Sequence, residues 1–270
     1  MKTTMERVYE HLYEAKQHFA ENHIVGIWLQ GSQNYELDLP TSDVDTKLIV
    51  TPTFKDIALA TKPVSTTHIR ENNEHIDAKD IRNYISCFHK QNLNFLEILF
   101  TPYNWVNPMY ESEWSRLIRC REQIARMNPY RAVKSMKGVA MEKYYAMEHR
   151  YPSKIEILDK YGYDGKQTHH LLRIEDFLER YIAGEDYEKC LIPTLSKQNH
   201  LLDYKKQLIP LTEACEEAQK ALEHINYIAD HFCNITEDKE SSEMRELLED
   251  VSYNIMKISV MEELKECIVH

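Results

Sequence analysis

The alternation of apolar and polar residues divides the chain into a mixed first part and a helical second part. Apolar positions within residues 4–20 recur at helical spacing and predict an amphipathic helix. Two apolar runs, residues 24–29 and 43–50, flank a polar, turn-rich connection and predict two strands. A further extended segment, residues 65–79, leads into a helix for which Asp80 is the expected N-cap.

After residue 127 the apolar periodicity is helical to the end of the chain. Pro129 suits the first turn of one helix, and Asp164 is the expected N-cap of another. Two long amphipathic helices flank the polar residues 234–240, and we expect them to pair as an antiparallel hairpin. We therefore predict an α+β fold. Residues 1–127 would form a small mixed sheet with flanking helices, and residues 128–270 an all-helical domain ending in the hairpin.

The second predicted strand begins with two carboxylates at positions i and i+2, Asp43 and Asp45. Side chains at this spacing in a strand point to the same face and lie about 7 Å apart along the chain. Both carboxylates can therefore share one or two hard divalent cations, and oxygen ligands of this kind suit Mg²⁺. The same residues also occur as decoration of a turn and a solvated strand edge, so the spacing alone leaves both interpretations open.

The first predicted strand ends at Gly31-Ser32, in a chain with only six glycines. Glycine lets a backbone adopt positive φ and approach a phosphate closely, and a serine hydroxyl adds a donor. Most Gly-Ser pairs are plain turns, but the acidic strand that follows favours a phosphate-binding turn here. Asp77, on the later extended segment, could lie beside the first two carboxylates, whereas Asp80 is better placed to cap a helix.

A basic stripe is predicted on the helix that follows Asp164. Lys166, His170 and Arg173 lie at i, i+4 and i+7, so they share one face, with His169 beside it. Such a stripe is either a solvated helix face or a site that neutralises phosphate charge. No cysteine lies near the two histidines, which disfavours zinc.

Composition excludes some classes of function. The net charge of −11 over 270 residues disfavours binding of nucleic acid or anionic membranes by the whole surface, although it leaves a local basic groove open. Six scattered cysteines without a C-x-x-C pair are typical of reduced thiols in the cytoplasm. No apolar run reaches the roughly 18 residues of a membrane span, so we expect a cytoplasmic protein with no membrane partner.

Taken together, these motifs resemble the DNA polymerase β-like nucleotidyltransferase superfamily, most of all a group of predicted nucleotidyltransferases from bacteria and phages. In that group the turn reads G-S-x-x-Y and the strand S-D-x-D, and a third carboxylate precedes a helix that leads to N-x-N and L-E-x-L-F segments. The second domain carries Y-D-x-K and H-L-x-R. The matching residues here are 31–35, 42–45, Asp77, 92–94, 96–100, 163–166 and 170–173. The resemblance spans residues 24–181, with Glu36 in place of a common glycine and Leu93 in place of a common proline.

The resemblance implies transfer of a nucleoside monophosphate from an NTP to a hydroxyl acceptor with release of pyrophosphate, a reaction of the EC 2.7.7 type. Residues 1–127 would be the catalytic domain, with two Mg²⁺ or Mn²⁺ ions held by Asp43, Asp45 and Asp77. The helical domain would complete the nucleotide site. The implied nucleotide-binding residues are Gly31, Ser32, Tyr35, Lys47, Lys166, His170 and Arg173.

Other questions stay open at the level of sequence. The acceptor could be a small molecule, a protein side chain or an RNA end. The C-terminal helices could pack within the chain or form a homodimer. A metal-dependent phosphohydrolase and a non-catalytic nucleotide-binding or antitoxin-like protein on the same scaffold are the alternative functions.

Overall fold

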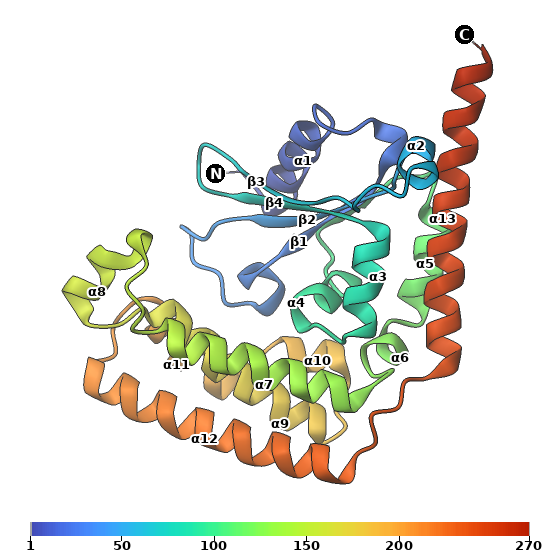
Figure 1. The fold of residues 1–270 in the computed structure, drawn as a ribbon. Helices are drawn as coiled ribbons and strands as arrows, with labels where there is room; N and C mark the ends of the chain where they lie inside the picture. The colour runs from blue at the N-terminus through green and yellow to red at the C-terminus, as the bar shows by residue number, and fades with distance from the viewer. Residues whose placement is uncertain (1, 270) are drawn as a thin grey trace. The chain divides into compact units, whose positions relative to one another are not determined.

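The computed structural model describes residues 2–269, with side chains up to Lys265. The fold is α+β, as predicted, with one mixed sheet and many helices (Figure 1). Contacts between Cα atoms divide the chain into two compact units, Met1–Met127 with Glu240–His270, and Asn128–Lys239. No helix among the described residues is both long and apolar enough to cross a membrane.

The sheet of the first unit has five strands in the order β3-β4-β2-β1-β5. The strands are β1 (Ile24–Gln30), β2 (Asp45–Val50), β3 (Ser65–Ile69), β4 (His75–Asp80) and β5 (Asn104–Val106). β2 lies in the middle, antiparallel to β1 and parallel to β4. Asp45 therefore begins a central strand, with a neighbouring strand on each side. Asp43 lies two residues before this strand, which is shorter than the predicted strand of residues 43–50.

Helices cover both faces of this sheet. The helices of the first unit are α1 (Thr4–Ala15), α2 (Phe54–Ala58), α3 (Ile81–His89), α4 (Leu93–Leu96), α5 (Glu111–Arg119), α6 (Arg121–Ala125) and α13 (Ser242–Val269). The apolar face of α1 packs on one side of the sheet, where the core contains Val8, Leu12, Leu29, Leu48, Val50 and Ile76. On the other side, Lys47 of β2 lies over the ring of Phe95 in α4. As predicted, the side chain of Asp80 caps α3 by accepting the N–H of Arg82 at 2.9 Å.

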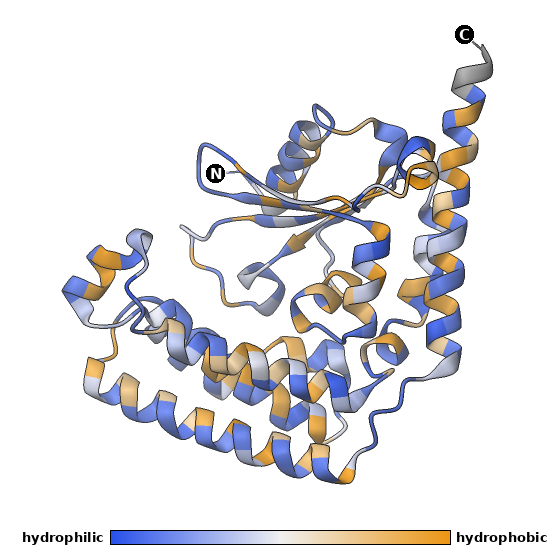
Figure 2. Cartoon of the chain, viewed as in Figure 1, coloured by the Kyte–Doolittle hydropathy of each residue, from blue (hydrophilic) through white to orange (hydrophobic). Residues whose placement is uncertain are grey.

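The last helix differs from the prediction. α13 packs against α3 and α5 of the first unit and buries Leu248, Val251 and Ile255. α12 (Leu211–Ile235) instead packs against α7 and α9 of the second unit. The expected hairpin is therefore wrong, and the second unit ends at Lys239 rather than at residue 270. Apolar positions recur along α13 (Figure 2), but such a stripe shows only that a face is buried and does not identify its partner.

The second unit is built around α9 (Gly165–Ile182), which contacts four other helices. Besides α12, these are α7 (Pro129–Ala146), α10 (Tyr187–Leu191) and α11 (Leu195–Lys205); the short α8 (Ile155–Tyr161) precedes α9. Pro129 stands in the first turn of α7, and the side chain of Asp164 accepts the N–H of Lys166 at 3.0 Å, so both predicted helix starts are confirmed.

Candidate functional site

The glycine-serine turn lies beside the acidic strand. Gln30, the last residue of β1, pairs with Asp45, the first residue of β2. Gly31 follows with φ +118° and ψ −158°, a conformation that L side chains rarely adopt. A Cβ added there would approach nothing closer than 3.8 Å, to Gln33 Oε1, so the backbone conformation and not a lack of space requires the glycine. The turn and the acidic strand are therefore neighbours in space.

Both carboxylates of the acidic pair retain open oxygens. The carboxylate of Asp43 is exposed and has no hydrogen-bond partner among the described residues, while its carbonyl oxygen accepts Gln33 Nε2 at 2.9 Å. Asp45 is partly exposed, and its Oδ1 accepts the backbone N–H of His75 at 2.9 Å and lies 3.1 Å from the ring Nδ1 of His75. These two carboxylates fit a hard divalent cation, because at least three of their four oxygens have no donor among the residues that the structure describes.

Asp77 lies on the same face of the sheet as Asp45, but it is already paired with two lysines. In the parallel ladder it is directly opposite Lys47, whose Nζ lies 2.7 Å from Asp77 Oδ2. Lys79 Nζ lies 3.1 Å from Asp77 Oδ1. Burial alone would raise the pKa of Asp77, but the two ammonium groups outweigh it and hold the pKa below its usual value. Asp77, as arranged here, does not fit the role of a metal ligand.

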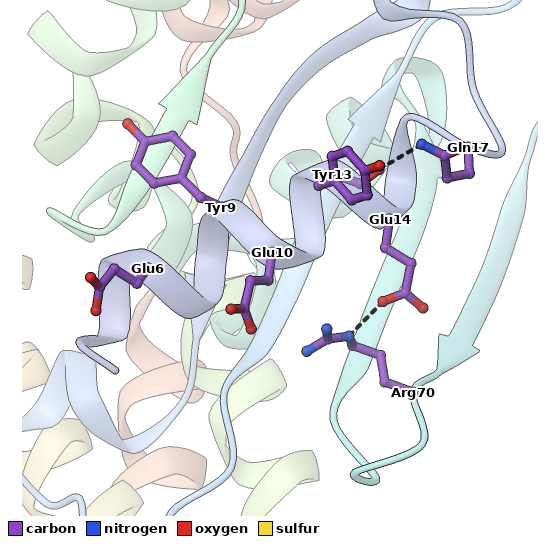
Figure 3. A pocket seen from close by; sticks show the side chains of 7 residues that line it. All are labelled: Glu6, Tyr9, Glu10, Tyr13, Glu14, Gln17 and Arg70. Atoms are coloured by element: carbon purple, nitrogen blue, oxygen red, sulfur yellow. Dashed lines mark hydrogen bonds and ion pairs between the residues drawn. The ribbon is translucent and has the colours of Figure 1, made fainter. Parts of the chain in front are cut away.

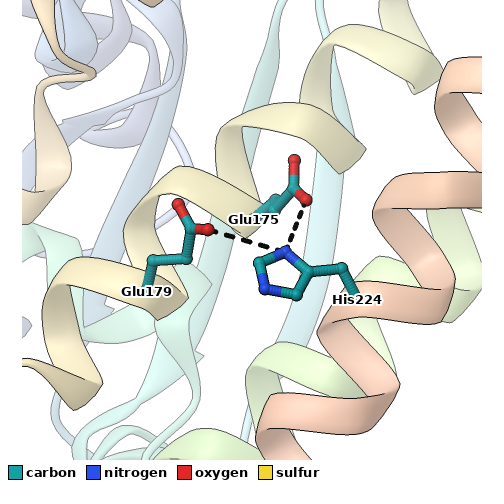
Figure 4. Close-up of side chains that lie close together, drawn as sticks. All are labelled: Glu175, Glu179 and His224. Carbon is teal, nitrogen blue, oxygen red and sulfur yellow. Dashed lines mark hydrogen bonds and ion pairs between the residues drawn. The ribbon is translucent and has the colours of Figure 1, made fainter.

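A metal-sized cluster of ligand atoms occurs elsewhere. Across the described part of the chain, one group of three His, Cys, Asp or Glu side chains has all its ligand atoms within 4.8 Å of one another: Glu175, Glu179 and His224 (Figure 4). His224 Nδ1 lies 2.9 Å from Glu175 Oε1 and 3.5 Å from Glu179 Oε1. Hydrogen bonding and ion pairing explain this partly exposed trio, so we assign it no ligand.

Tyr35 is a correction to the sequence-based site. The resemblance implies that this residue contacts the nucleotide, but its side chain is only 4% exposed and lies in the core. Its hydroxyl donates a hydrogen bond to Glu97, which is 1% exposed. Tyr35 comes from the G-S-x-x-Y segment and Glu97 from the L-E-x-L-F segment, so these two motifs meet in a structural contact that closes the connection onto the core.

Sequence reasoning missed the buried carboxylate of Glu74, which is 1% exposed. Four donors converge on it: the backbone N–H of Val44 at 3.1 Å, Arg7, His11 Nε2 at 3.0 Å and Arg70 Nη1 at 2.7 Å. Arg7 also donates to the carbonyl oxygen of Ser42 at 3.1 Å. Glu74 and Arg7 therefore hold the backbone on both sides of Asp43. In the sequence, Glu74 follows two asparagines and looks like part of an ordinary turn.

The basic residues of the second unit lie on α9 as predicted, but they are not a uniformly solvated stripe. Lys166 is exposed, His170 is partly buried, and Arg173 is 4% exposed. The pKa of His170 lies well below its usual value, because of burial first and then because of the positive charges around it, which include Lys143 of α7. The ring of His170 is therefore neutral at pH 7, and the charge of this group of side chains comes from the lysines and the arginine.

His169 has a structural environment. It is 1% exposed, and its Nδ1 donates to the carbonyl oxygen of Leu201 at 2.9 Å. Burial lowers its pKa to about 4, although the hydrogen bond to Leu201 opposes this. His169 therefore anchors α9 to α11 as a neutral ring.

A surface hollow of about 450 Å³ lies along the outer face of α1 (Figure 3). It is lined by Glu6, Tyr9, Glu10, Tyr13, Glu14, Gln17 and Arg70. Arg70 reaches it from the end of β3 and forms an ion pair with Glu14 at 2.7 Å, and Gln17 Nε2 donates to the carbonyl oxygen of Tyr13 at 3.4 Å. None of the predicted site residues lines this hollow, so it is not the predicted nucleotide site.

Comparisons with known proteins identify no family. No family model and no curated protein matches the chain. One similar solved structure is that of a nucleotidyltransferase-like protein from Exiguobacterium sibiricum 255-15. The match covers 84% of this chain and 75% of that chain, with 11% sequence identity and a TM-score of 0.29. A likeness at that TM-score carries no argument, so any function must be inferred from the motifs and the geometry of the site.

Proposed function

We propose that the first unit is a nucleotidyltransferase, which transfers a nucleoside monophosphate from an NTP to a hydroxyl acceptor and releases pyrophosphate. One observation carries the proposal: the Gly31-Ser32 turn follows the end of β1 at the point where β1 pairs with Asp45, and both Asp45 and the nearby Asp43 have open carboxylate oxygens. A turn that accepts phosphate beside carboxylates that accept a hard cation is the combination that phosphoryl chemistry requires.

Each residue has a proposed role at this site. Asp43 and Asp45 would hold Mg²⁺ or Mn²⁺, which when bound offsets phosphate charge and lowers the pKa of the acceptor hydroxyl. The backbone of Gly31 and the hydroxyl of Ser32 would bind the terminal phosphates. His75 would fix the orientation of Asp45, because two of its nitrogens lie within 3.1 Å of one carboxylate oxygen.

The second unit enters the proposal through the resemblance. The resemblance alone supports Lys166, His170 and Arg173 as phosphate-binding residues of this unit, with His170 as a neutral hydrogen-bonding group. No resemblance or contact identifies the acceptor, which stays open among small molecules, protein side chains and RNA ends.

The test uses each of the four NTPs labelled at the α-phosphate, with Mg²⁺ and with separate pools of RNA, protein and small metabolites. The expected result is label in one pool together with stoichiometric pyrophosphate. Asp45→Ala should lower the rate by about 100-fold or more. Asp38→Ala, which removes an exposed carboxylate from the same connection, is the matched control and should stay within about twofold of the wild type.

Two other outcomes would replace the proposal. Release of inorganic phosphate, without transfer of label, would identify a metal-dependent phosphohydrolase. Tight NTP binding with no turnover in any pool would indicate a non-catalytic nucleotide-binding protein, one of the alternatives that the motifs leave open.

A further inference from the structure

We propose that the ammonium groups of Lys47 and Lys79 take the place of a second divalent cation, so that the site binds a single ion, on Asp43 and Asp45. Asp77 then anchors the two lysines and is not a metal ligand. The inference rests on the proposed nucleotide site and differs from the two-ion, three-carboxylate arrangement that the sequence motifs imply.

The contacts of Asp77 carry the first step. Each of its two carboxylate oxygens has its own ammonium partner, Lys47 at 2.7 Å and Lys79 at 3.1 Å. Lys79 Nζ also donates a hydrogen bond to the hydroxyl of Ser65 on β3 at 3.1 Å. A cation that binds either oxygen of Asp77 must therefore share that oxygen with a hydrogen-bonded ammonium group or displace the group.

Burial makes that displacement costly. The side chains of Lys47, Asp77 and Lys79 are 6%, 17% and 18% exposed. The Nζ of Lys47 lies 4.2 Å from the centre of the Phe95 ring, and that of Lys79 lies 5.6 Å from it. Both ammonium groups are thus held between a carboxylate and an aromatic face, an arrangement that stabilises a cation away from water.

The charge of this trio opposes a metal and suits a phosphate. One carboxylate and two ammonium groups leave a net positive charge, which repels a divalent ion at short range and in a partly desolvated place. The same charge attracts phosphoryl oxygens and requires no metal. Lys47 is two residues from Asp45 on one strand face, and Asp77 is directly opposite Lys47, so the positive charge lies next to the metal-binding pair.

The test counts ions on the full-length wild-type chain. Mn²⁺ is titrated against the protein without nucleotide, and free Mn²⁺ is measured by its electron paramagnetic resonance signal. The expected stoichiometry is one ion per chain, with at least about a tenfold weaker dissociation constant in Asp45→Asn. Two ions per chain in the wild type, one of them lost in Asp77→Asn, would overturn the inference and leave the proposed function standing. No bound ion would also overturn the inference, while the proposed function would still be decided by transfer of the labelled nucleotide.

A second arm asks whether the lysines block the other ion. In a Lys47→Met, Lys79→Met variant, Asp77 is freed and the expected stoichiometry rises from one ion to two. Lys62→Met, an exposed lysine outside the site, is the control and should still bind one ion. Tryptophan fluorescence compares the folding of each variant with that of the wild type. A folded double variant that still binds one ion would contradict the blocking role of the lysines.

Discussion

Replacing Glu74 with alanine is expected to destabilise the first unit more than any other single loss of a carboxylate around α1. The mutation removes the common acceptor of four donors. Arg70 keeps Glu14 at 2.7 Å, and Arg7 keeps the carbonyl oxygen of Ser42 at 3.1 Å. The backbone N–H of Val44 and the Nε2 of His11, which are both buried, lose the acceptor that Glu74 provides.

The magnitude follows from these two donors. Each buried donor left without an acceptor costs about 1–3 kcal/mol. Removing one partner of a buried ionic group costs about 3–5 kcal/mol in all, and we expect a loss of free energy of unfolding in that range for Glu74→Ala. The matched control is Glu14→Ala, because Glu14 pairs with Arg70 and with His68 but its side chain is 28% exposed. A partly exposed pair of this kind contributes about 0–1 kcal/mol.

Urea unfolding followed by tryptophan fluorescence is the appropriate assay. All three tryptophans, Trp28, Trp105 and Trp114, lie in the first unit, so their emission reports on that unit, while the far-ultraviolet circular dichroism also reports on the second. If Glu74→Ala and Glu14→Ala unfold within about 1 kcal/mol of each other, the conclusion that Glu74 holds the acidic strand is incorrect.

Three further predictions concern single positions. Gly31→Ala should lower the free energy of unfolding by about 1–2 kcal/mol, because the φ of +118° is unfavourable for alanine. Gly138→Ala, in a helix with open space around the glycine, should raise it by about 0.5–1 kcal/mol. Equal changes for the two variants in urea unfolding would contradict the strain argument. Burial lowers the pKa of His169 from 6.5 to about 4. The contribution of its neutral ring to the free energy of unfolding is therefore fully present above pH 6.5, and up to about 3 kcal/mol of it is lost as the pH falls towards 4. His169→Gln should make the free energy of unfolding, measured in urea between pH 4 and pH 7, less dependent on pH. An unchanged dependence on pH would refute this role of His169. Tyr35→Phe removes the hydroxyl that donates to the buried Glu97 and should lower the free energy of unfolding by about 1–3 kcal/mol, which is measured as a fall in Tm. An unchanged Tm would mean that this hydrogen bond contributes little.

Much of the local structure was determined by the sequence itself. The apolar spacing of α1, the two strands around the acidic connection and the caps at Asp80 and Asp164 are short-range features. They depend on residues within a few positions of one another, so a sequence window contains the interactions that form them. The positive φ of Gly31 belongs to the same class, because a sharp turn after a strand favours glycine whatever surrounds it.

Tertiary structure alone decided which partners these elements have. α13 packs against α3 and α5 of the first unit, and nothing within the helix distinguishes these partners from α12, the partner that the sequence pattern favoured. The pairing of Lys47 with Asp77 depends on the register of two strands that are thirty residues apart, and the convergence of Arg7, His11 and Arg70 on Glu74 needs α1 docked on the sheet. Long-range pairing of charges is set by packing, and for this reason the motif implied Asp77 as a third metal ligand, whereas in the fold Asp77 is bound to two lysines and the other two carboxylates are open.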